Sequence, residues 1–234
     1  MIKYLVAVIA LVVLIWGVQL AVLYSHIGSY KKYWEKQNAQ TVAGDPIIYM
    51  ALGDSTAQGI GASNPKHSYP VLIARWLNHE TGRPVRLINV SVSGAKVNGV
   101  VTKQIPLLAA YPKPDITTIE IGANDMSVFN EQSFTAQMQT LVKLLPPYTY
   151  ISDIPAFTGR AKGKDPLAVK AGNIIHQSIQ GTDLRFVNLY NATKSNSGIG
   201  YFAADWFHPN NKAYIKWAQA FEATMTTRVT ELKR

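Results

Sequence analysis

The pattern of apolar and polar positions divides the chain into two parts. From Tyr4 to Tyr24 it runs through 21 residues without a charged side chain, and from Pro46 onward short apolar runs alternate with segments of helical periodicity. About 20 apolar residues in a helix are enough to cross the hydrocarbon core of a bilayer. The pattern therefore predicts an N-terminal membrane helix followed by a globular domain.

The alternation after residue 46 predicts the fold class of this domain. Strands that alternate with helices form βαβ units, which build a parallel sheet with helices on both faces. We therefore expect an α/β fold, a three-layer αβα sandwich around a five-stranded parallel sheet, with one helix kinked or started near Pro106. The expected strands lie within residues 46–53, 85–94, 114–125, 148–155 and 184–190, and the expected helices within residues 69–82, 97–111, 131–147, 165–181 and 210–232.

The last of these helices carries a periodic aromatic stripe. Tyr214, Trp217, Phe221 and Met225 recur at spacings of three and four residues. Such spacing is typical of a helix that packs one side on a core. We interpret these side chains as core residues rather than as a cofactor site.

The N-terminal apolar run is longer than a cleaved signal peptide requires. Signal peptides carry an apolar region of roughly 7–15 residues followed by a small-residue cleavage site, and the sequence AVLYSH at the end of this run offers no such site. The run also lacks the polar face of a helix packed in a soluble core. We interpret it as an uncleaved signal anchor.

The predicted organisation has three parts, namely the signal anchor (residues 1–24), a juxtamembrane stalk (25–45) and the globular domain (46–234). Orientation is less strongly indicated, because Lys3 precedes the apolar run while Lys31 and Lys32 follow it, and lysines favour the cytoplasmic side. We expect the N-terminus inside and the domain outside the cytoplasm.

Composition narrows the chemistry that the domain can perform. Hydrophobic residues make up 47% of the chain, which is ample for a buried core, and the absence of cysteine excludes disulfides, thiolate nucleophiles and Cys-ligated zinc. The net charge is +9. The lysines are scattered, with no basic helix interleaved with aromatic residues and no zinc-finger spacing, so a solvated basic surface is favoured over a nucleic-acid site. Such a surface attracts anionic membranes or cell-wall polymers.

Unusual polar residues follow the predicted strands. In open α/β sheets, ligands bind at the carboxyl ends of the strands, where the loops meet at one edge. Four polar loops fall there, namely Gly53-Asp54-Ser55, Ser91-Val92-Ser93-Gly94, Gly122-Ala123-Asn124-Asp125 and residues 203–211 with the sequence AADWFHPNN.

These loops carry a family resemblance over roughly residues 47–230. Four short blocks resemble, in order, those of the SGNH hydrolases, the GDSL esterase/lipase superfamily: Gly53-Asp54-Ser55, Gly94 after a serine, Gly122-x-Asn124-Asp125 and Asp205-x-x-His208-Pro209. One such tripeptide is a weak signal, but four blocks in order are specific. The resemblance implies an SGNH or flavodoxin-like fold for the domain at residues 46–234.

The resemblance also implies a role for each of these residues. Ser55 is expected to be the nucleophile, His208 the general base and Asp205 the group that orients the imidazole. The oxyanion hole would comprise the Ser55 amide, the Gly94 amide and the Asn124 side chain. No cofactor is expected, because no phosphate-binding or dinucleotide motif follows a strand, and no metal, because no histidine cluster is present.

Two structural alternatives to these roles remain open, and two positions depart from the family pattern. Ser55 after a strand could be an ordinary helix N-cap, and Asp205 with His208 could merely cap the last helix. Family members often carry leucine where this chain has Thr56, and glycine where it has Trp206. Neither change removes a reacting atom.

The leading functional hypothesis is a membrane-anchored serine ester hydrolase that forms an acyl-enzyme on Ser55. Its expected substrate is a small-molecule, lipid or cell-wall ester. The alternatives are an O-acyltransferase or carbohydrate deacetylase with the same triad, and a catalytically inactive tethered binding module. The sequence does not indicate an oligomeric state.

Overall fold

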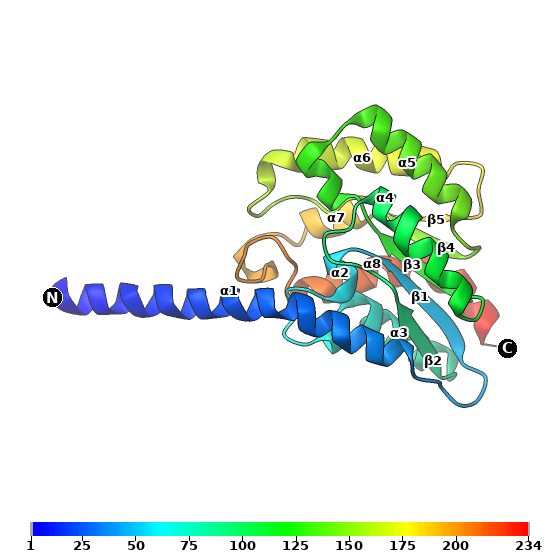
Figure 1. The fold of residues 1–234 in the computed structure, drawn as a ribbon, viewed down its shortest axis with the longest axis horizontal. Coiled ribbons are helices and arrows are strands. Elements are labelled where there is room, and N and C mark those ends of the chain that lie inside the picture. Colours follow the sequence, from blue (N-terminus) through cyan, green and yellow to red (C-terminus); the bar gives the residue numbers. More distant parts are fainter. Residues whose placement is uncertain (1, 234) are drawn as a thin grey trace.

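The structure is a computed structural model that describes residues 2–233. A long helix, α1 (Ile2–Asn38), leads into an α/β domain (Figure 1). The domain is built on five parallel strands in the order β2-β1-β3-β4-β5. The predicted five-stranded parallel sheet is therefore confirmed, and its strand order is that of flavodoxin-like folds. The strands are β1 (Ile47–Gly53), β2 (Val85–Asn89), β3 (Ile116–Glu120), β4 (Thr149–Ser152) and β5 (Arg185–Val187).

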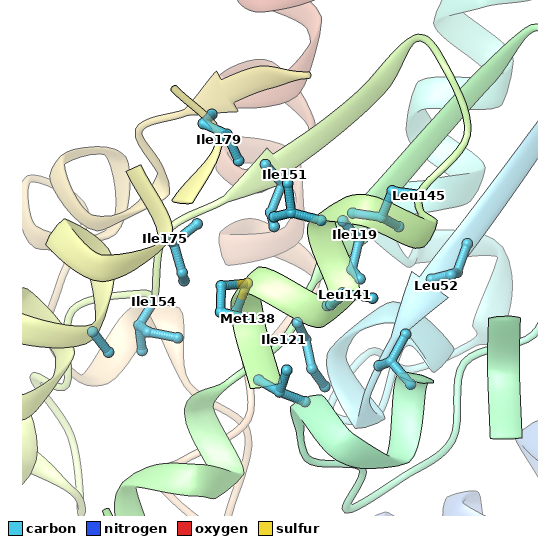
Figure 2. Packing of buried hydrophobic residues seen from close by; sticks show 14 of the residues in the cluster. Leu52, Ile119, Ile121, Met138, Leu141, Leu145, Ile151, Ile154, Ile175 and Ile179 are labelled. Atoms are coloured by element: carbon cyan, nitrogen blue, oxygen red, sulfur yellow. The ribbon is translucent and has the colours of Figure 1, made fainter. Parts of the chain in front are cut away.

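Helices cover both faces of the sheet, as the three-layer prediction requires. One apolar core lies between the sheet and α3 and α8, and a second lies between the sheet and α4, α5 and α6. Figure 2 shows the second core, where Met138 and Leu141 of α5 pack against Ile119 of β3 and Ile151 of β4. The helices of the domain are α2 (Ser55–Gln58), α3 (Tyr69–Thr81), α4 (Val97–Gly99), α5 (Glu131–Leu144), α6 (Asp165–Ser178), α7 (Leu189–Lys194) and α8 (Asn211–Leu232).

Two predicted elements differ in the structure. The helix expected over residues 97–111 is a single α-turn, then a π-helical turn (Val100–Gln104), then a 3-10 helix (Ile105–Ala110), because Pro106 cannot donate the backbone hydrogen bond of a regular helix. The strand expected over residues 184–190 is only three residues long. The Asn188 side chain accepts a hydrogen bond from the Asn191 backbone and begins α7 there.

The aromatic stripe of α8 is buried, as predicted. Tyr214, Trp217, Phe221 and Met225 all face the core, and the Phe221 ring stacks on the Tyr69 ring of α3 with centroids 5.3 Å apart and planes inclined by 6°. The stripe therefore joins α8 to α3 as well as to the sheet.

The N-terminal helix is longer than the predicted anchor. It continues without a break past residue 24 through most of the expected stalk, to Asn38. Its last turns pack on the domain, where Tyr30 and Trp34 are buried and donate to the backbone carbonyls of Ala62 (2.7 Å) and Gln58 (3.0 Å). The Asn38 side chain pairs with the backbone N–H and C=O of Asn89. Burial of these aromatic side chains explains why the helix persists beyond the apolar run.

The first residues of α1, 2–15, project away from the domain (Figure 1). As a whole, α1 is long and apolar enough to cross a membrane, and its most hydrophobic stretch is not buried in the protein. A helix packed in a soluble core would bury such residues.

The stacked pair between α3 and α8 yields a stability prediction. Phe221→Ala should lower the free energy of unfolding by about 3–5 kcal/mol, because it removes a fully buried ring and leaves a cavity. Chemical unfolding of the detergent-solubilised full chain measures the change. Thr227→Ala, on the exposed side of the same helix, is the control and should change stability by less than about 0.5 kcal/mol. Equal unfolding midpoints for the two variants would contradict this packing.

Candidate active site

Ser55 lies at the carboxyl end of β1, as the first residue of α2. The N-cap of α2 is Asp54, whose side chain accepts a hydrogen bond from the Thr56 backbone (2.9 Å). The alternative that Ser55 is merely an N-cap is therefore wrong. Its hydroxyl is free to point at other groups.

The structure brings Ser55, His208 and Asp205 together. Ser55 Oγ lies 3.0 Å from His208 Nε2, and His208 Nδ1 lies 2.7 Å from Asp205 Oδ2. Asp205 is 5% exposed and Ser55 is 7% exposed, so bulk water has little access to the residues at the two ends of this hydrogen-bonded series. A hydroxyl, an imidazole and a carboxylate in series form the geometry of an activated nucleophile.

The Asp205 carboxylate is held ionised by its neighbours. Burial alone would raise its pKa, but hydrogen bonds from the His208 ring and from the backbone N–H groups of Phe207 and His208 lower the pKa to about 2. The N-cap of α8 is Asn210, which accepts from the backbones of Lys212 and Ala213. The alternative that Asp205 and His208 only cap the last helix is therefore wrong.

A glycine allows the histidine loop to approach the nucleophile loop. Gly61 has a φ of +97°, and a Cβ there would collide with the Pro209 carbonyl oxygen and lie 2.8 Å from His208 Cβ. Any other residue would push the two loops apart. The contact between Ser55 and His208 depends on this close approach.

The residues expected in the oxyanion hole lie in the two neighbouring loops. Gly94 follows β2 in a turn with a φ of +76° and is exposed. Asn124 follows β3, and its Nδ2 donates to Asp54 Oδ2 (2.9 Å) and to the Ala95 carbonyl (3.0 Å). Both amide hydrogens of Asn124 therefore have protein partners here. Asn124 thus ties the loop after β3 to the loops that carry Ser55 and Gly94.

A buried polar network beneath Ser55 escaped the sequence analysis. Thr56 Oγ1 lies 3.0 Å from Asp54 Oδ1 and 2.5 Å from Glu120 Oε2. Burial, and then the negative charge of Asp54, raise the pKa of Glu120 well above its ordinary value, so Glu120 is a neutral acid that can donate to Thr56. Gln104 completes the network by pairing with both the N–H and C=O of Gly53 (3.0 and 2.7 Å). A glutamate inside the apolar strand ITTIEIG was the available signal.

The model of the GDSL-like lipase/acylhydrolase family matches residues 51–215 of the chain. The chain belongs to this family. It is therefore a member of a family of carboxylic ester hydrolases, and all four blocks of the predicted motif lie in the matched range.

The chain is also similar to a curated relative in sequence and to solved structures in fold. The GDSL-like esterase Rv1075c of Mycobacterium tuberculosis is 39% identical over 91 residues, which are 39% of this chain and 29% of that protein. The chain thus spans under a third of this curated relative. Two solved structures share the fold: TesA (20% identical, 77% of this chain and 99% of that one, TM-score 0.62) and Axe2, an acetylxylan esterase from Geobacillus stearothermophilus (18%, 78% and 95%, TM-score 0.61).

The two departures from the family pattern now have structural explanations. Thr56 supplies the hydroxyl that joins Asp54 to Glu120, a contact that the leucine common in the family cannot make. Trp206 has a φ of +58°, a left-handed conformation that glycine adopts without strain and other residues at a cost of about 1–3 kcal/mol. The carbonyl of Trp206 accepts a hydrogen bond from the Arg160 backbone (2.7 Å), which helps to hold this conformation.

An apolar cavity of about 50 Å³ adjoins the nucleophile. Two loops form most of its wall, residues 155–161 and 201–209, and the wall is rich in aromatic rings. Ser55 and Trp206 both line it, so the tryptophan forms part of the wall of the cavity that adjoins the reacting hydroxyl. The aromatic lining residues are Phe157, Tyr201, Phe202, Trp206, Phe207 and Trp217.

The buried network predicts unequal effects for isosteric substitutions. Thr56→Val keeps the side-chain shape but leaves Glu120 and Asp54 without their shared hydroxyl, so the free energy of unfolding should fall by about 1–3 kcal/mol. Thr56→Ser and Glu120→Gln retain a polar partner, so each should lower the free energy of unfolding by less than Thr56→Val does. Thermal and denaturant unfolding of the four proteins measure this order. A Thr56→Val variant as stable as wild type would show that the hydroxyl contributes nothing.

Proposed function

We propose that this chain is a membrane-anchored serine esterase that cleaves carboxylic esters through an acyl-enzyme on Ser55. The observation that carries the proposal is the series of two short contacts, 3.0 Å from Ser55 Oγ to His208 Nε2 and 2.7 Å from His208 Nδ1 to Asp205 Oδ2. Membership in a family of lipases and acylhydrolases supports the same chemistry.

In the first half of the proposed reaction, Ser55 Oγ bonds to the ester carbonyl carbon while its proton passes to His208 Nε2. The ionised Asp205 stabilises the imidazolium and keeps Nδ1 protonated. As the bond to the alcohol oxygen breaks, His208 gives that oxygen the proton and the acyl group stays on Ser55. Water then repeats the sequence, with its proton passing to His208 and the carboxylic acid leaving.

The negative charge that develops on the carbonyl oxygen requires donors. We assign this role to the backbone N–H groups of Ser55 and Gly94 and to Asn124 Nδ2. Because both Asn124 hydrogens already have acceptors, Asn124 must share or exchange one of these bonds when the oxyanion forms. Its contact with Asp54 holds the amide group in place beforehand, which is the arrangement that favours electrostatic stabilisation.

We further propose that residues 1–24 anchor the protein in a membrane, residues 25–45 connect the anchor to the domain, and residues 46–234 form the esterase domain outside the cytoplasm. The exposed apolar surface of the first half of α1 supports the anchor. The connecting residues are helical to Asn38 and docked on the domain, which makes the link between anchor and active site rigid.

The proposed substrate is an ester with a short acyl group. A cavity of about 50 Å³ beside Ser55, bounded by aromatic rings, has room for only a few heavy atoms. The acetylxylan esterase activity named for Axe2 is consistent with a small acyl group. Deacetylation of a carbohydrate by the same triad is thus within the proposal, whereas the complete series of Ser55, His208 and Asp205 argues against an inactive binding module.

Hydrolysis of p-nitrophenyl esters, from acetyl to long acyl chains, by the full chain in detergent tests the proposal. Ser55→Ala should abolish turnover, and Asp205→Asn should lower kcat by about 10³–10⁴-fold, because the amide favours the wrong histidine tautomer. Ser178→Ala, with no hydrogen bond from its side chain in the described structure, is the matched control. Equal background rates for wild type and Ser55→Ala would refute a serine esterase. Product transferred to an added sugar alcohol would reveal an acyltransferase.

Trp206 offers a separate test of the acyl pocket. Trp206→Gly removes the ring that narrows the cavity and places in the left-handed position the residue best suited to it. The optimum chain length in the p-nitrophenyl series should therefore shift from short towards longer acyl groups. An unchanged chain-length profile would mean that the acyl group binds elsewhere.

A further inference from the structure

We propose that the catalytic edge of the domain is itself a lipid-binding surface that seats the mouth of the active site on an anionic bilayer. This inference rests on the proposed function and narrows its substrate to esters carried by molecules held in that bilayer. It follows from the direction of α1, from its free length and from the side chains around the site.

The active site faces the end of the molecule from which the anchor projects. In Figure 1, the loop before α8 (orange) lies beside the middle of α1, on the side of the domain from which the N-terminal part of α1 projects, and β1 runs towards this side to end at α2. Ser55 begins α2 and His208 lies in that loop. A membrane crossed by α1 therefore lies on the catalytic side of the domain, not on the opposite side.

The free part of α1 is too short to cross a bilayer without the domain. Trp16 Nε1 donates to the Ala204 carbonyl (2.8 Å), and Leu23 packs against Ile60 and Ala203. Only residues 2–15 extend beyond these contacts, about 21 Å of helix, whereas the hydrocarbon core is about 30 Å thick. An anchor that spans the bilayer must therefore include residues beside Ala203 and Ala204. This requirement brings the loop before Asp205 to the membrane surface.

The catalytic edge exposes apolar side chains where membrane contact is expected. The side chain of Ile199 is 74% exposed, Val128 69%, Val92 43% and Trp206 42%. Val92 follows β2, Val128 follows β3, and Ile199 and Trp206 follow β5, so the four come from the loops of three strands rather than from one local cluster. Solvent-exposed apolar side chains around a mouth are typical of interfacial binding.

The same loops also carry an unbalanced positive charge. Within residues 91–96, 122–130, 155–164 and 194–210, all of which the structure describes, no carboxylate is exposed, because Asp125 and Asp205 are buried. Cations beside apolar residues favour anionic headgroups over zwitterionic ones. The exposed cations on these loops are Lys96, Arg160, Lys162, Lys164 and Lys194, and the exposed carboxylate that borders them, Glu131, is paired with Lys170 (2.6 Å).

Contact between the catalytic edge and the bilayer determines the route by which an ester reaches Ser55. The cavity beside Ser55 is walled by residues 155–161 and 201–209, the loops that carry Arg160 and Trp206. A water-soluble ester must reach it past the membrane, whereas an amphiphile in the leaflet presents its polar end directly at the mouth. The preferred substrate is thus an acyl ester near the headgroup of an amphiphile in an anionic bilayer.

The position of the catalytic edge can be measured directly, because the chain has no cysteine. Single variants Ile199→Cys and Lys113→Cys, each carrying an environment-sensitive fluorophore, would be reconstituted as full chains into phosphatidylcholine vesicles with and without phosphatidylglycerol. Lys113 precedes β3 at the opposite edge of the sheet and is exposed. Nitroxide lipids should quench the label at 199 and not at 113, more strongly with phosphatidylglycerol. Equal quenching at both positions would overturn the proposal.

A kinetic test separates this inference from the proposed function. For Ile199→Asp, the ratio of the rate on a vesicle-held ester to that on soluble p-nitrophenyl acetate should fall about tenfold, since a charge replaces a lipid-facing side chain. Leu144→Asp, an exposed apolar position at the end of α5, should leave the ratio unchanged. If wild type hydrolyses neither ester, the proposed function fails. If it hydrolyses both and Ile199→Asp keeps the wild-type ratio, only the lipid surface fails.

Discussion

The contact between Ser55 and His208 joins residues 153 positions apart, and the rest of the site depends on that distance. Two hydrogen bonds between α8 and the segment that follows α2 help to maintain it. The Tyr214 hydroxyl of α8 donates to the Ile60 carbonyl (2.7 Å), and the Asn211 side chain accepts from the Ser63 backbone (2.9 Å). Because α8 is packed on α3 and on the sheet, these bonds fix the position of His208 relative to the rigid core of the domain.

Beneath the nucleophile, the interior of the domain contains a hydrogen-bonded polar network instead of apolar side chains. Glu120 and Gln104 are fully buried beside the apolar core that contains Leu52. Burying such groups is unfavourable unless each is hydrogen-bonded. Here the polar atoms fix the Gly53-Asp54-Ser55 turn from below, through Gly53 and Thr56. The network therefore stabilises the one backbone segment whose displacement would misplace both the nucleophile and its amide.

Much of this architecture could be predicted from the sequence, because it depends on local patterns. The five strands follow from short apolar runs, and the positions of Ser55 and His208 follow from motifs at strand ends and in the last loop. The irregular turns after Val97 could not be predicted in detail, because they combine a proline effect with tertiary packing. Glu120 could not be given a partner, because its bond to Thr56 crosses 64 residues and leaves no periodic signal.

The sequence could not decide whether α1 docks on the domain, because aromatic side chains such as Tyr30 and Trp34 suit a membrane interface as well as a packed surface. This docking connects α1 to a loop of the active site through hydrogen bonds. Trp34 donates to the Gln58 carbonyl, while the Gln58 side chain donates to the Ser91 carbonyl and accepts from the Ser93 hydroxyl. Gln58 of α2 thus links α1 to the loop that ends in Gly94. In such an arrangement α1 is part of the framework of the active site, because the helix that we propose as the membrane anchor also positions the loop expected to supply an oxyanion donor.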